Sequence, residues 1–245
     1  GRRTKIMKQV YLDQNVSVQD VICLDVKQAH HIFDVLRTTS KEKIRIVTKN
    51  SGVFFGHVEN KPNLVVDSMV DVFEENQSIT LCCALIKQDK FEWMLQKACE
   101  LGVHKIVPFV SKNTVVKLDE KKAEKKLIRW NEILLAATKQ CNRNTLVELE
   151  PVITLKELSN YKSECNLVAY EKENEPSKHM ARYLKDNPQS ITVCIGPEGG
   201  FEKSEIQVLN EFGFDNCSLG KNILRAETAA CYVLTAIEYQ NHVEG

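Results

Sequence analysis

The sequence predicts an α/β protein in which a small β-rich domain precedes a larger domain built on a parallel sheet. Two observations carry this prediction. Over about the first seventy of the 245 residues, segments rich in Val, Ile and Phe are separated by turn residues, which is typical of strands. From Ser78 onward, short apolar runs alternate with amphipathic helical patterns, and such alternation indicates a parallel sheet covered on both faces.

The N-terminal domain is predicted over residues 1–73. Its strand-like segments are "KQVYL", "IRIVTK", "VFFGHVE" and "NLVVDSMVDVF", with turns at "KNSG" and "NKPN". One helix is expected around "QAHHIFDVLR", where Ile32, Val35 and Leu36 have helical spacing. The pattern favours a small β-barrel or sandwich with one helix. The polar segment "EENQS", Glu74–Ser78, is the predicted linker.

The second domain is predicted over residues 78–245. Its expected strands are "SITLCCALI", "KIVPFVS", "NLVAYE", "ITVCIG" and "NCSLG". Its expected helices are "KFEWMLQKACELG", closed by Gly102, then "DEKKAEKKLIRWNEILLAATKQC", "SKHMARYLKD", "EKSEIQVLNEFG" and a final helix from Ala226 to His242. Ligands of such sheets bind beyond the carboxyl ends of the strands. The expected binding loops are therefore "AYEKENE", "GPEGG" and "LGKNILRAE".

Composition excludes several classes of protein. A hydrophobic content of 43% with 27% charged residues is that of an ordinary soluble protein, and no apolar run approaches the roughly 20 residues that cross a bilayer. The basic start "GRRTKIMKQV" has no apolar segment behind it, so no secretory signal is expected. The nine cysteines are scattered without a C-x-x-C pair, which favours reduced, buried thiols in a cytoplasmic protein and no metal site.

The stretch "ITVCIGPEGGFEKSEI" places a glycine turn between an apolar strand and an acidic helix start. Glycines at 196, 199 and 200 permit backbone angles closed to other residues, and Pro197 fixes one more. The helix is expected to begin near Glu202, where acidic side chains suit its positive end. A strand, glycine turn and helix in this order let backbone amides approach a ligand. A tight connection that binds nothing is the alternative.

The segment "SLGKNILRAETAA" repeats this arrangement near the C-terminus. Asn222 is suited to capping, Ile223 and Leu224 to lining an apolar slot, and Arg225 brings a permanent charge. Two glycine loops with an apolar lining suit a flat heteroaromatic ligand held by backbone groups. Neither the phosphate-binding loop G-x-x-x-x-G-K-[ST] nor the dinucleotide fingerprint G-x-G-x-x-G is present.

Together these motifs resemble the RsmE family of SPOUT-class methyltransferases. The pair "IGPEGGF" and "LGKNILRAETAA" is similar to the family signature, and "QKACELGVHKIVPF", "ATKQCNRN" and "HHIFDVLR" resemble other family segments in the expected order. The resemblance implies methylation of N3 of a uridine in 16S ribosomal RNA of the small subunit, with S-adenosylmethionine as the cofactor. It further implies a PUA-like β-barrel domain, a SPOUT methyltransferase domain with a C-terminal trefoil knot, and a homodimer.

The resemblance also implies which residues form the cofactor site. In the family, both glycine loops enclose S-adenosylmethionine, and the acidic end of the strand "NLVAYE" lies at the same pocket. Carried over position by position, the expected cofactor contacts are Glu171, Gly196, Pro197, Glu198, Gly199, Gly200, Leu219, Gly220, Ile223, Leu224 and Thr228.

Methyl transfer to N3 of uridine requires the nitrogen to lose a proton, because the protonated nitrogen is a poor nucleophile. The enzyme must stabilise negative charge on the ring or place a base beside it. Arg225 is the expected stabiliser, with a salt bridge to Glu227 or Glu198 as the alternative. Glu198 is the expected base, with capping of the following helix as the alternative.

Residues that hold RNA are expected on a local basic face, because the net charge is zero and lysines concentrate between Lys117 and Trp130. The expected RNA-binding residues are Arg37, Lys121, Lys122, Lys125, Lys126, Gln140 and Arg143. A plain solvated helix face is the alternative for the lysines. Polar residues that merely end a long helix are the alternative for Gln140 and Arg143.

Other functions stay open at this point. They are a SPOUT methyltransferase acting on another RNA, a different α/β enzyme that uses a nucleotide, and a non-catalytic RNA-binding or ribosome-assembly factor. The missing phosphate loops count against the nucleotide-using enzyme. The homodimer is also favoured by the final helix "AACYVLTAIEY", which has more hydrophobic surface than one buried face requires. No membrane partner is expected.

Overall fold

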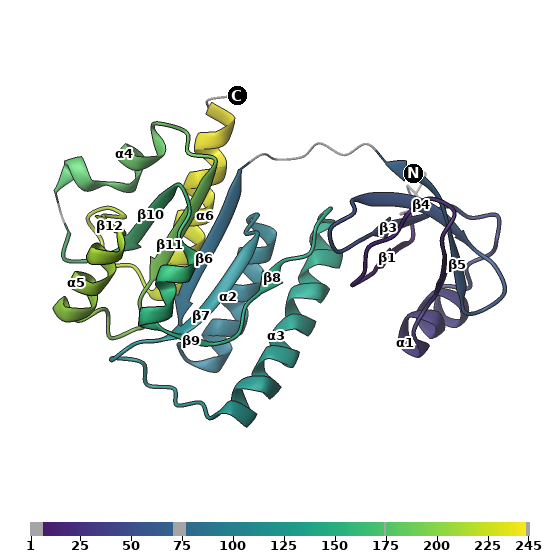
Figure 1. The fold of residues 1–245 in the computed structure, drawn as a ribbon, viewed down its shortest axis with the longest axis horizontal. Coiled ribbons are helices and arrows are strands. Elements are labelled where there is room, and N and C mark those ends of the chain that lie inside the picture. The colour runs from purple at the N-terminus through teal and green to yellow at the C-terminus, as the bar shows by residue number, and fades with distance from the viewer. Residues whose placement is uncertain (1–6, 71–76, 174, 244–245) are drawn as a thin grey trace, which may run out of the picture. The chain divides into compact units, whose positions relative to one another are not determined.

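The structure is a computed structural model that describes residues 7–70, 77–173 and 175–243 (Figure 1). The described chain divides into two compact units. Residues 7–70 with Arg143–Leu146 form the first unit, and residues 77–142 with the described residues from Val147 onward form the second. Positions 74–76 of the predicted linker lie outside the described residues, and Ser78 already begins a strand.

The first unit is built on a curled five-stranded mixed sheet. Its strands are β1 (Gln9–Tyr11), β2 (Val21–Cys23), β3 (Ile44–Val47), β4 (Val53–Val58) and β5 (Asn63–Val70). They lie in the order β1-β3-β4-β5-β2, with β1 and β3 parallel and the other pairs antiparallel. Strand β2 was not predicted, because its three residues are too few for alternation to identify it.

The predicted helix of the first unit is present but is not a regular α-helix. A short α-helix, α1 (Val26–Ala29), continues into a π-helical segment, η1 (His30–Val35). The Leu36 amide donates to the His31 carbonyl at 2.9 Å, an i→i+5 bond that widens the turn. Ile32 is buried as expected, whereas the expectation that Val35 faces the core is wrong, since its side chain is 56% exposed. The wider turn rotates Val35 away from the core.

The second unit confirms the predicted parallel sheet. Its strands are β6 (Ser78–Ala84), β7 (Lys105–Val110), β8 (Glu148–Leu149), β9 (Ile153–Thr154), β10 (Cys165–Ala169), β11 (Ser190–Ile195) and β12 (Asp215–Cys217). The order is β12-β10-β11-β6-β7-β8, with β9 also pairing with β7, and every pair is parallel. Strands β8 and β9 have only two residues each and were not predicted from the sequence.

Helices cover both faces of this sheet (Figure 1). They are α2 (Gln88–Glu100), α3 (Glu120–Cys141), α4 (Met180–Leu184), α5 (Lys203–Phe212) and α6 (Ala226–Val243), with the 3-10 segments η2 (Leu155–Tyr161) and η3 (Pro176–Lys178). Along β6, Leu81 and Cys83 belong to a core shared with α2, α4 and α6, whereas Cys82 and Ala84 pack on the opposite face with α5 and η2. Two covered faces explain the continuous apolar character of the strand.

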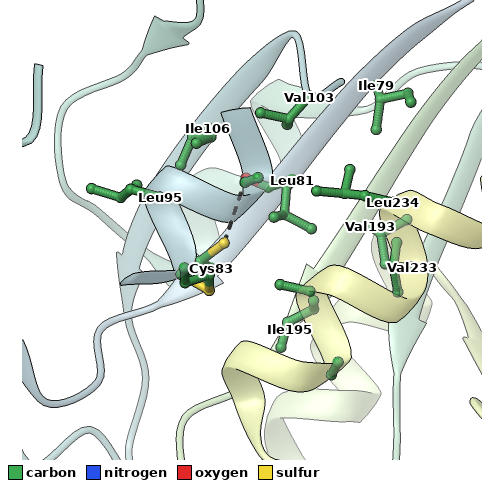
Figure 2. Close-up of a cluster of buried hydrophobic side chains, with 14 of the residues drawn as sticks. Ile79, Leu81, Cys83, Leu95, Val103, Ile106, Val193, Ile195, Val233 and Leu234 are labelled. Carbon is green, nitrogen blue, oxygen red and sulfur yellow. Dashed lines mark hydrogen bonds between the residues drawn. The ribbon is translucent and has the colours of Figure 1, made fainter. Parts of the chain in front are cut away.

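Figure 2 shows the larger of these two cores. Side chains from three neighbouring strands meet side chains from α2 and α6, and among them are Leu81, Leu95, Val193, Ile195, Val233 and Leu234. Helix α3 packs outside α2, where the Phe91 and Trp130 rings lie 4.6 Å apart between centroids. Helices α2 and α6 share this core, and residues from the first turns of both lie together at the carboxyl edge of the sheet.

The cysteines are mostly interior, as predicted. Cys82, Cys83, Cys99, Cys194 and Cys217 are buried free thiols, whereas Cys23 is exposed. Burial raises the pKa of Cys217 to about 12, so this thiol stays protonated at neutral pH. Within the described residues, no group of three or more His, Cys, Asp or Glu side chains is arranged to hold a metal ion. Among the helices of the described chain, none is long and apolar enough to span a membrane.

Candidate active site

The three predicted binding loops meet in one pocket of about 370 Å³ at the carboxyl edge of the parallel sheet. The ends of β10, β11 and β12 bring these loops together, and α2 adds one side chain, Lys90, which was not predicted from the sequence. Of the expected contacts, nine line the pocket: Glu171, Gly196, Pro197, Glu198, Gly200, Leu219, Gly220, Ile223 and Leu224. Gly199 and Thr228 lie nearby in the chain but are not part of this lining.

The loop "GPEGG" is a tight turn whose glycines lie close to neighbouring side chains. The Gly200 amide donates to the Pro197 carbonyl at 2.9 Å, and Gly200 has a φ of +73°. This left-handed conformation is strained for other residues, and a Cβ at position 200 would lie 3.2 Å from Glu171 Oε1. The turn therefore needs glycine here both for its backbone angle and for the approach of the neighbouring loop.

Asn113, which follows β7, holds the outer side of this turn. Its Nδ2 lies 3.3 Å from the Gly199 carbonyl oxygen, 3.2 Å from that of Gly200 and 3.0 Å from Glu202 Oε1. A Cβ at Gly199 would lie 3.0 Å from Asn113 Cβ, so Gly199 packs against Asn113 instead of lining the pocket. No pattern in the sequence points to Asn113, because its three partners lie about ninety residues further on.

Glu198 is the predicted base, with capping of the following helix, α5, as the alternative. Its carboxylate instead faces the N-terminus of α2. Glu198 Oε1 accepts a hydrogen bond from the Lys87 amide at 3.2 Å, at the N-terminus of α2. The alternative that Glu198 caps the following helix is wrong, because α5 is capped by Glu202 and Glu205 in a reciprocal capping box. Glu198 therefore connects the glycine loop to the N-terminus of α2.

The last loop is fixed by backbone pairing beneath it. The Met180 amide donates to the Ser218 carbonyl and the Ser218 amide donates to the Lys178 carbonyl, both at 2.9 Å. Leu219 and Leu224 are partly buried against the main core, as an apolar slot requires. Ile223 is 79% exposed, so its side chain forms the rim of the pocket.

The pocket carries charges of both signs. Its carboxylates are Glu171, Glu173, Glu198 and Glu227, and its cations are Lys90, Lys221 and Arg225. Arg225 is exposed, and in the described chain its guanidinium forms no ion pair with Glu198 or Glu227, so the salt-bridge alternative is not realised. Glu227 Oε2 is shielded from solvent and has no hydrogen-bond partner among the described residues.

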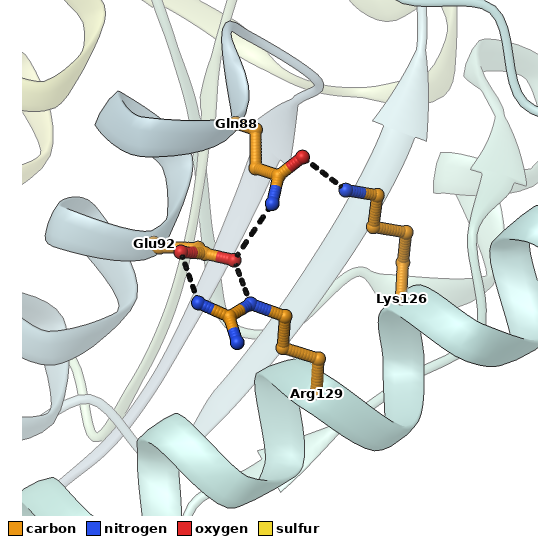
Figure 3. Close-up of polar contacts among 4 residues, drawn as sticks. All are labelled: Gln88, Glu92, Lys126 and Arg129. Carbon is orange, nitrogen blue, oxygen red and sulfur yellow. Dashed lines mark hydrogen bonds and ion pairs between the residues drawn. The ribbon is translucent and has the colours of Figure 1, made fainter.

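The predicted RNA-binding lysines differ in their exposure and in their side-chain contacts. Lys121, Lys122 and Lys125 are exposed on the first half of α3. Lys126 instead donates to Gln88 of α2, and the neighbouring Arg129 pairs with Glu92 (Figure 3). Lys126 and Arg129 therefore connect α3 to α2 and stabilise the packing of these two helices.

The remaining predicted RNA-binding residues fall in both units. Gln140 is exposed in the last turn of α3, in the second unit. Arg37 is exposed and has a φ of +49° just after the π-helical segment of the first unit. Arg143 belongs to the first unit, and its Nη2 donates to Thr145 Oγ1 at 3.2 Å.

A family model described as an RNA methyltransferase domain matches residues 73–238. The match covers the parallel sheet and its pocket, so the second unit is an RNA methyltransferase domain. A protein of Bacillus subtilis named ribosomal RNA small subunit methyltransferase E is 31% identical over 241 residues, covering 94% of each chain. The chain belongs to the ribosomal RNA small subunit methyltransferase E family, which is the RsmE family that its motifs resemble.

Two solved structures share this fold over nearly the whole chain. A methyltransferase of Legionella pneumophila in complex with SAM is 29% identical, with a TM-score of 0.81 over 96% of this chain and 98% of that chain. Ribosomal RNA small subunit methyltransferase E of Neisseria gonorrhoeae, bound to S-adenosyl methionine, is 28% identical, with a TM-score of 0.78 and the same coverage.

Proposed function

We propose that this chain is an S-adenosylmethionine-dependent methyltransferase that methylates N3 of a uridine in 16S ribosomal RNA of the small subunit. The observation that carries the proposal is the junction of both glycine loops in one pocket at the carboxyl edge of the sheet. Relatives named for methylation of small-subunit ribosomal RNA, and related structures that hold the cofactor, support the class of reaction. The choice of uridine N3 rests on the motif resemblance.

The residues of the pocket fit S-adenosylmethionine. Leu219 and Leu224 offer an apolar surface for the adenine, and the glycine loops bring backbone groups close to it. The Glu227 carboxylate oxygen that lacks a partner is suited to accept a hydrogen bond from a polar group of the ligand. When bound, S-adenosylmethionine supplies a methyl group that is electrophilic because the attached sulfur is positively charged.

Arg225 is proposed to stabilise negative charge on the uridine ring. Its guanidinium lies at the pocket without an ion-pair partner in the described chain, so its charge is available to a substrate. An arginine stays charged at all relevant pH values, and an electrostatic stabiliser acts chiefly in the transition state. Holding the ring in line with the methyl group would supply the rest of the rate enhancement.

Glu198 is proposed to act mainly as an anchor for the glycine loop. Its carboxylate already accepts the Lys87 amide at the N-terminus of α2, and a base must instead be free to accept the substrate proton. The assignment of Glu198 as the base stays a prediction that mutation can test.

The domain assignment is also part of the proposal. The first unit is proposed to be a PUA-like RNA-binding domain over residues 1–73, and the second a SPOUT domain over residues 78–245 with a C-terminal trefoil knot. The route of the chain supports the knot: β12 lies at the sheet edge, Ser218 pairs with Lys178 and Met180, and α6 then returns to the core beside α2. A cytoplasmic location follows from the site of ribosome assembly.

A homodimer is proposed as the working form. Tyr232 and Tyr239 of α6 are 37% and 69% exposed, and Trp93 of α2 is 44% exposed, although these helices also bury one face in the core. Exposed aromatic side chains are enriched where subunits meet. A monomeric mass by light scattering at micromolar concentration would contradict this part of the proposal.

Labelled methyl transfer tests the proposed function directly. The protein is incubated with radiolabelled S-adenosylmethionine and either assembled small subunits or naked 16S ribosomal RNA, and the modified nucleoside is then identified and mapped. The expected product is a single uridine methylated at N3. Label in another nucleotide would favour a methyltransferase with a different target, and no label with either substrate would favour a non-catalytic assembly factor.

A further inference from the structure

Two charged side chains of the pocket, Lys90 and Glu227, are partly withdrawn from water and also lack a partner in the described chain. Glu227 Oε2 is shielded from solvent without a hydrogen-bond donor, and the half-buried Lys90 lines the same pocket without an ion pair or hydrogen bond in the described chain. They lie in the first turns of α6 and α2, the two helices that share one core. A shielded carboxylate oxygen without a donor is unfavourable, so we expect a ligand to supply the donor.

The other carboxylates of the pocket are differently placed. Glu198 Oε1 accepts the Lys87 amide at 3.2 Å, and Glu173 Oε1 accepts the Glu175 amide at 3.3 Å. Glu171 is exposed to solvent, as are the cations Lys221 and Arg225. Lys90 and Glu227 are therefore the pair of opposite charges that is both partly withdrawn from water and unsatisfied.

We propose that Lys90 and Glu227 together recognise the amino-acid end of S-adenosylmethionine, with Glu227 accepting from the α-ammonium group and Lys90 pairing with the α-carboxylate. This inference rests on the proposed cofactor. The amino-acid end of the ligand carries both a positive α-ammonium group and a negative α-carboxylate. This one part of the ligand can therefore pair with both unsatisfied side chains. Contact with the ribose hydroxyl groups would satisfy Glu227 but leave Lys90 without a partner.

Calorimetry with two ligands that differ only in this end tests the proposal. S-adenosylhomocysteine carries the amino-acid end, whereas 5′-methylthioadenosine keeps the adenine, ribose and sulfur but lacks it. Glu227→Gln and Lys90→Met, which preserve side-chain size, should each weaken S-adenosylhomocysteine binding by roughly tenfold or more. Binding of 5′-methylthioadenosine should stay within about twofold of the parent, which also shows that each variant is folded.

Matched controls come from the same helices. Lys97→Met on α2 and Glu238→Gln on α6 change charges outside the pocket, where Lys97 pairs with Glu100 and Glu238 with His242, and should leave both affinities unchanged. An equal loss of affinity for both ligands would overturn the proposal in favour of a ribose contact. A loss of S-adenosylhomocysteine affinity in only one of the two variants would also overturn it, because the two side chains would then not act together. Unchanged binding in both variants would overturn it as well. If the parent protein binds neither ligand, the proposed cofactor itself is wrong.

Discussion

The Glu198 carboxylate accepts a hydrogen bond from the Lys87 amide at 3.2 Å, and so joins the "GPEGG" loop to the N-terminus of α2. This contact connects the ends of the neighbouring strands β11 and β6 beyond the sheet. Glu198 is the base that the sequence suggests, yet its carboxylate lies against a helix terminus. Substitutions at Glu198 can therefore distinguish a role as base from a role as anchor of the loop.

Glu198→Gln should leave the methyl-transfer rate within about threefold of the parent, because the glutamine oxygen still accepts the hydrogen bond from the Lys87 amide. The substitution removes only the negative charge at the helix N-terminus, whose contribution is small. Single-turnover transfer to small subunits measures the rate. A loss of a hundredfold or more at unchanged cofactor affinity would restore the assignment of Glu198 as the base. Glu198→Ala removes the acceptor and serves as the comparison, with weakened cofactor binding expected.

Arg225→Ala should keep most of the affinity for S-adenosylmethionine and lose methyl transfer by roughly a hundredfold or more, the scale seen when one electrostatic stabiliser is removed. The reason is that a charge acting on the developing uridinate contributes mainly in the transition state. Calorimetry and single-turnover kinetics on the same preparation separate the two quantities. Transfer at the parent rate would show that Arg225 has no part in the chemistry.

Asn113→Ala should weaken cofactor binding although Asn113 does not line the pocket, because its amide holds the Gly199 and Gly200 carbonyls and Glu202. Asn113→Asp should be at least as damaging, since its carboxylate would face the same acceptors. Gly199→Val should act by the same route: its Cβ would displace Asn113, 3.0 Å away, and shift the turn. Normal cofactor binding in all three variants, measured by calorimetry, would show that the turn does not depend on this contact.

Replacing Lys121, Lys122 and Lys125 with glutamine should weaken RNA binding and flatten its dependence on salt. Each lost phosphate contact removes roughly 0.7 to 0.9 from the slope of log K against log salt concentration. Lys126→Gln should leave that slope unchanged, because Lys126 is bound to Gln88 (Figure 3). Filter binding over a range of salt concentrations provides the measurement. An unchanged slope in the triple variant would make the lysines a plain solvated face.

The Arg129–Glu92 pair should make stability depend on pH in the acid range. The hydrogen bond from Arg129 is the main cause that holds the pKa of Glu92 below its ordinary value of 4.5. A lowered pKa contributes stability above that ordinary value, and the contribution is lost as pH falls through the folded-state pKa. Arg129→Met should therefore lower the free energy of unfolding only slightly at neutral pH, since Arg129 is largely exposed, and should not change it once Glu92 is protonated.

Urea unfolding of the parent and Arg129→Met proteins at neutral and acid pH checks this expectation. Lys125→Met, on the same helix and outside this pair, is the control and should show no such pH dependence. An equal difference between parent and variant at both pH values would show that Arg129 stabilises the protein through packing alone.

The sequence by itself determined the parallel sheet and the location of its binding edge. Apolar runs such as "SITLCCALI" are continuous because Leu81 and Cys82 are buried on opposite faces, and the glycine loops must follow the strands that precede them. Signals of this kind are local in the chain. The departures from prediction were local as well: strand β2 is too short to recognise, and a π-helical turn rotates Val35 out of the core.

Only the tertiary structure decided which side chains serve the pocket and which serve the fold. The fold brings together Lys90, Asn113 and Glu227, which belong to segments that are distant in sequence but close in space. The same holds for Glu198, whose hydrogen-bond partner lies 111 residues away. Periodicity and turn chemistry describe neighbours along the chain, whereas hydrogen bonds and charge pairs depend on distances of a few ångströms that are fixed when the whole sheet has assembled.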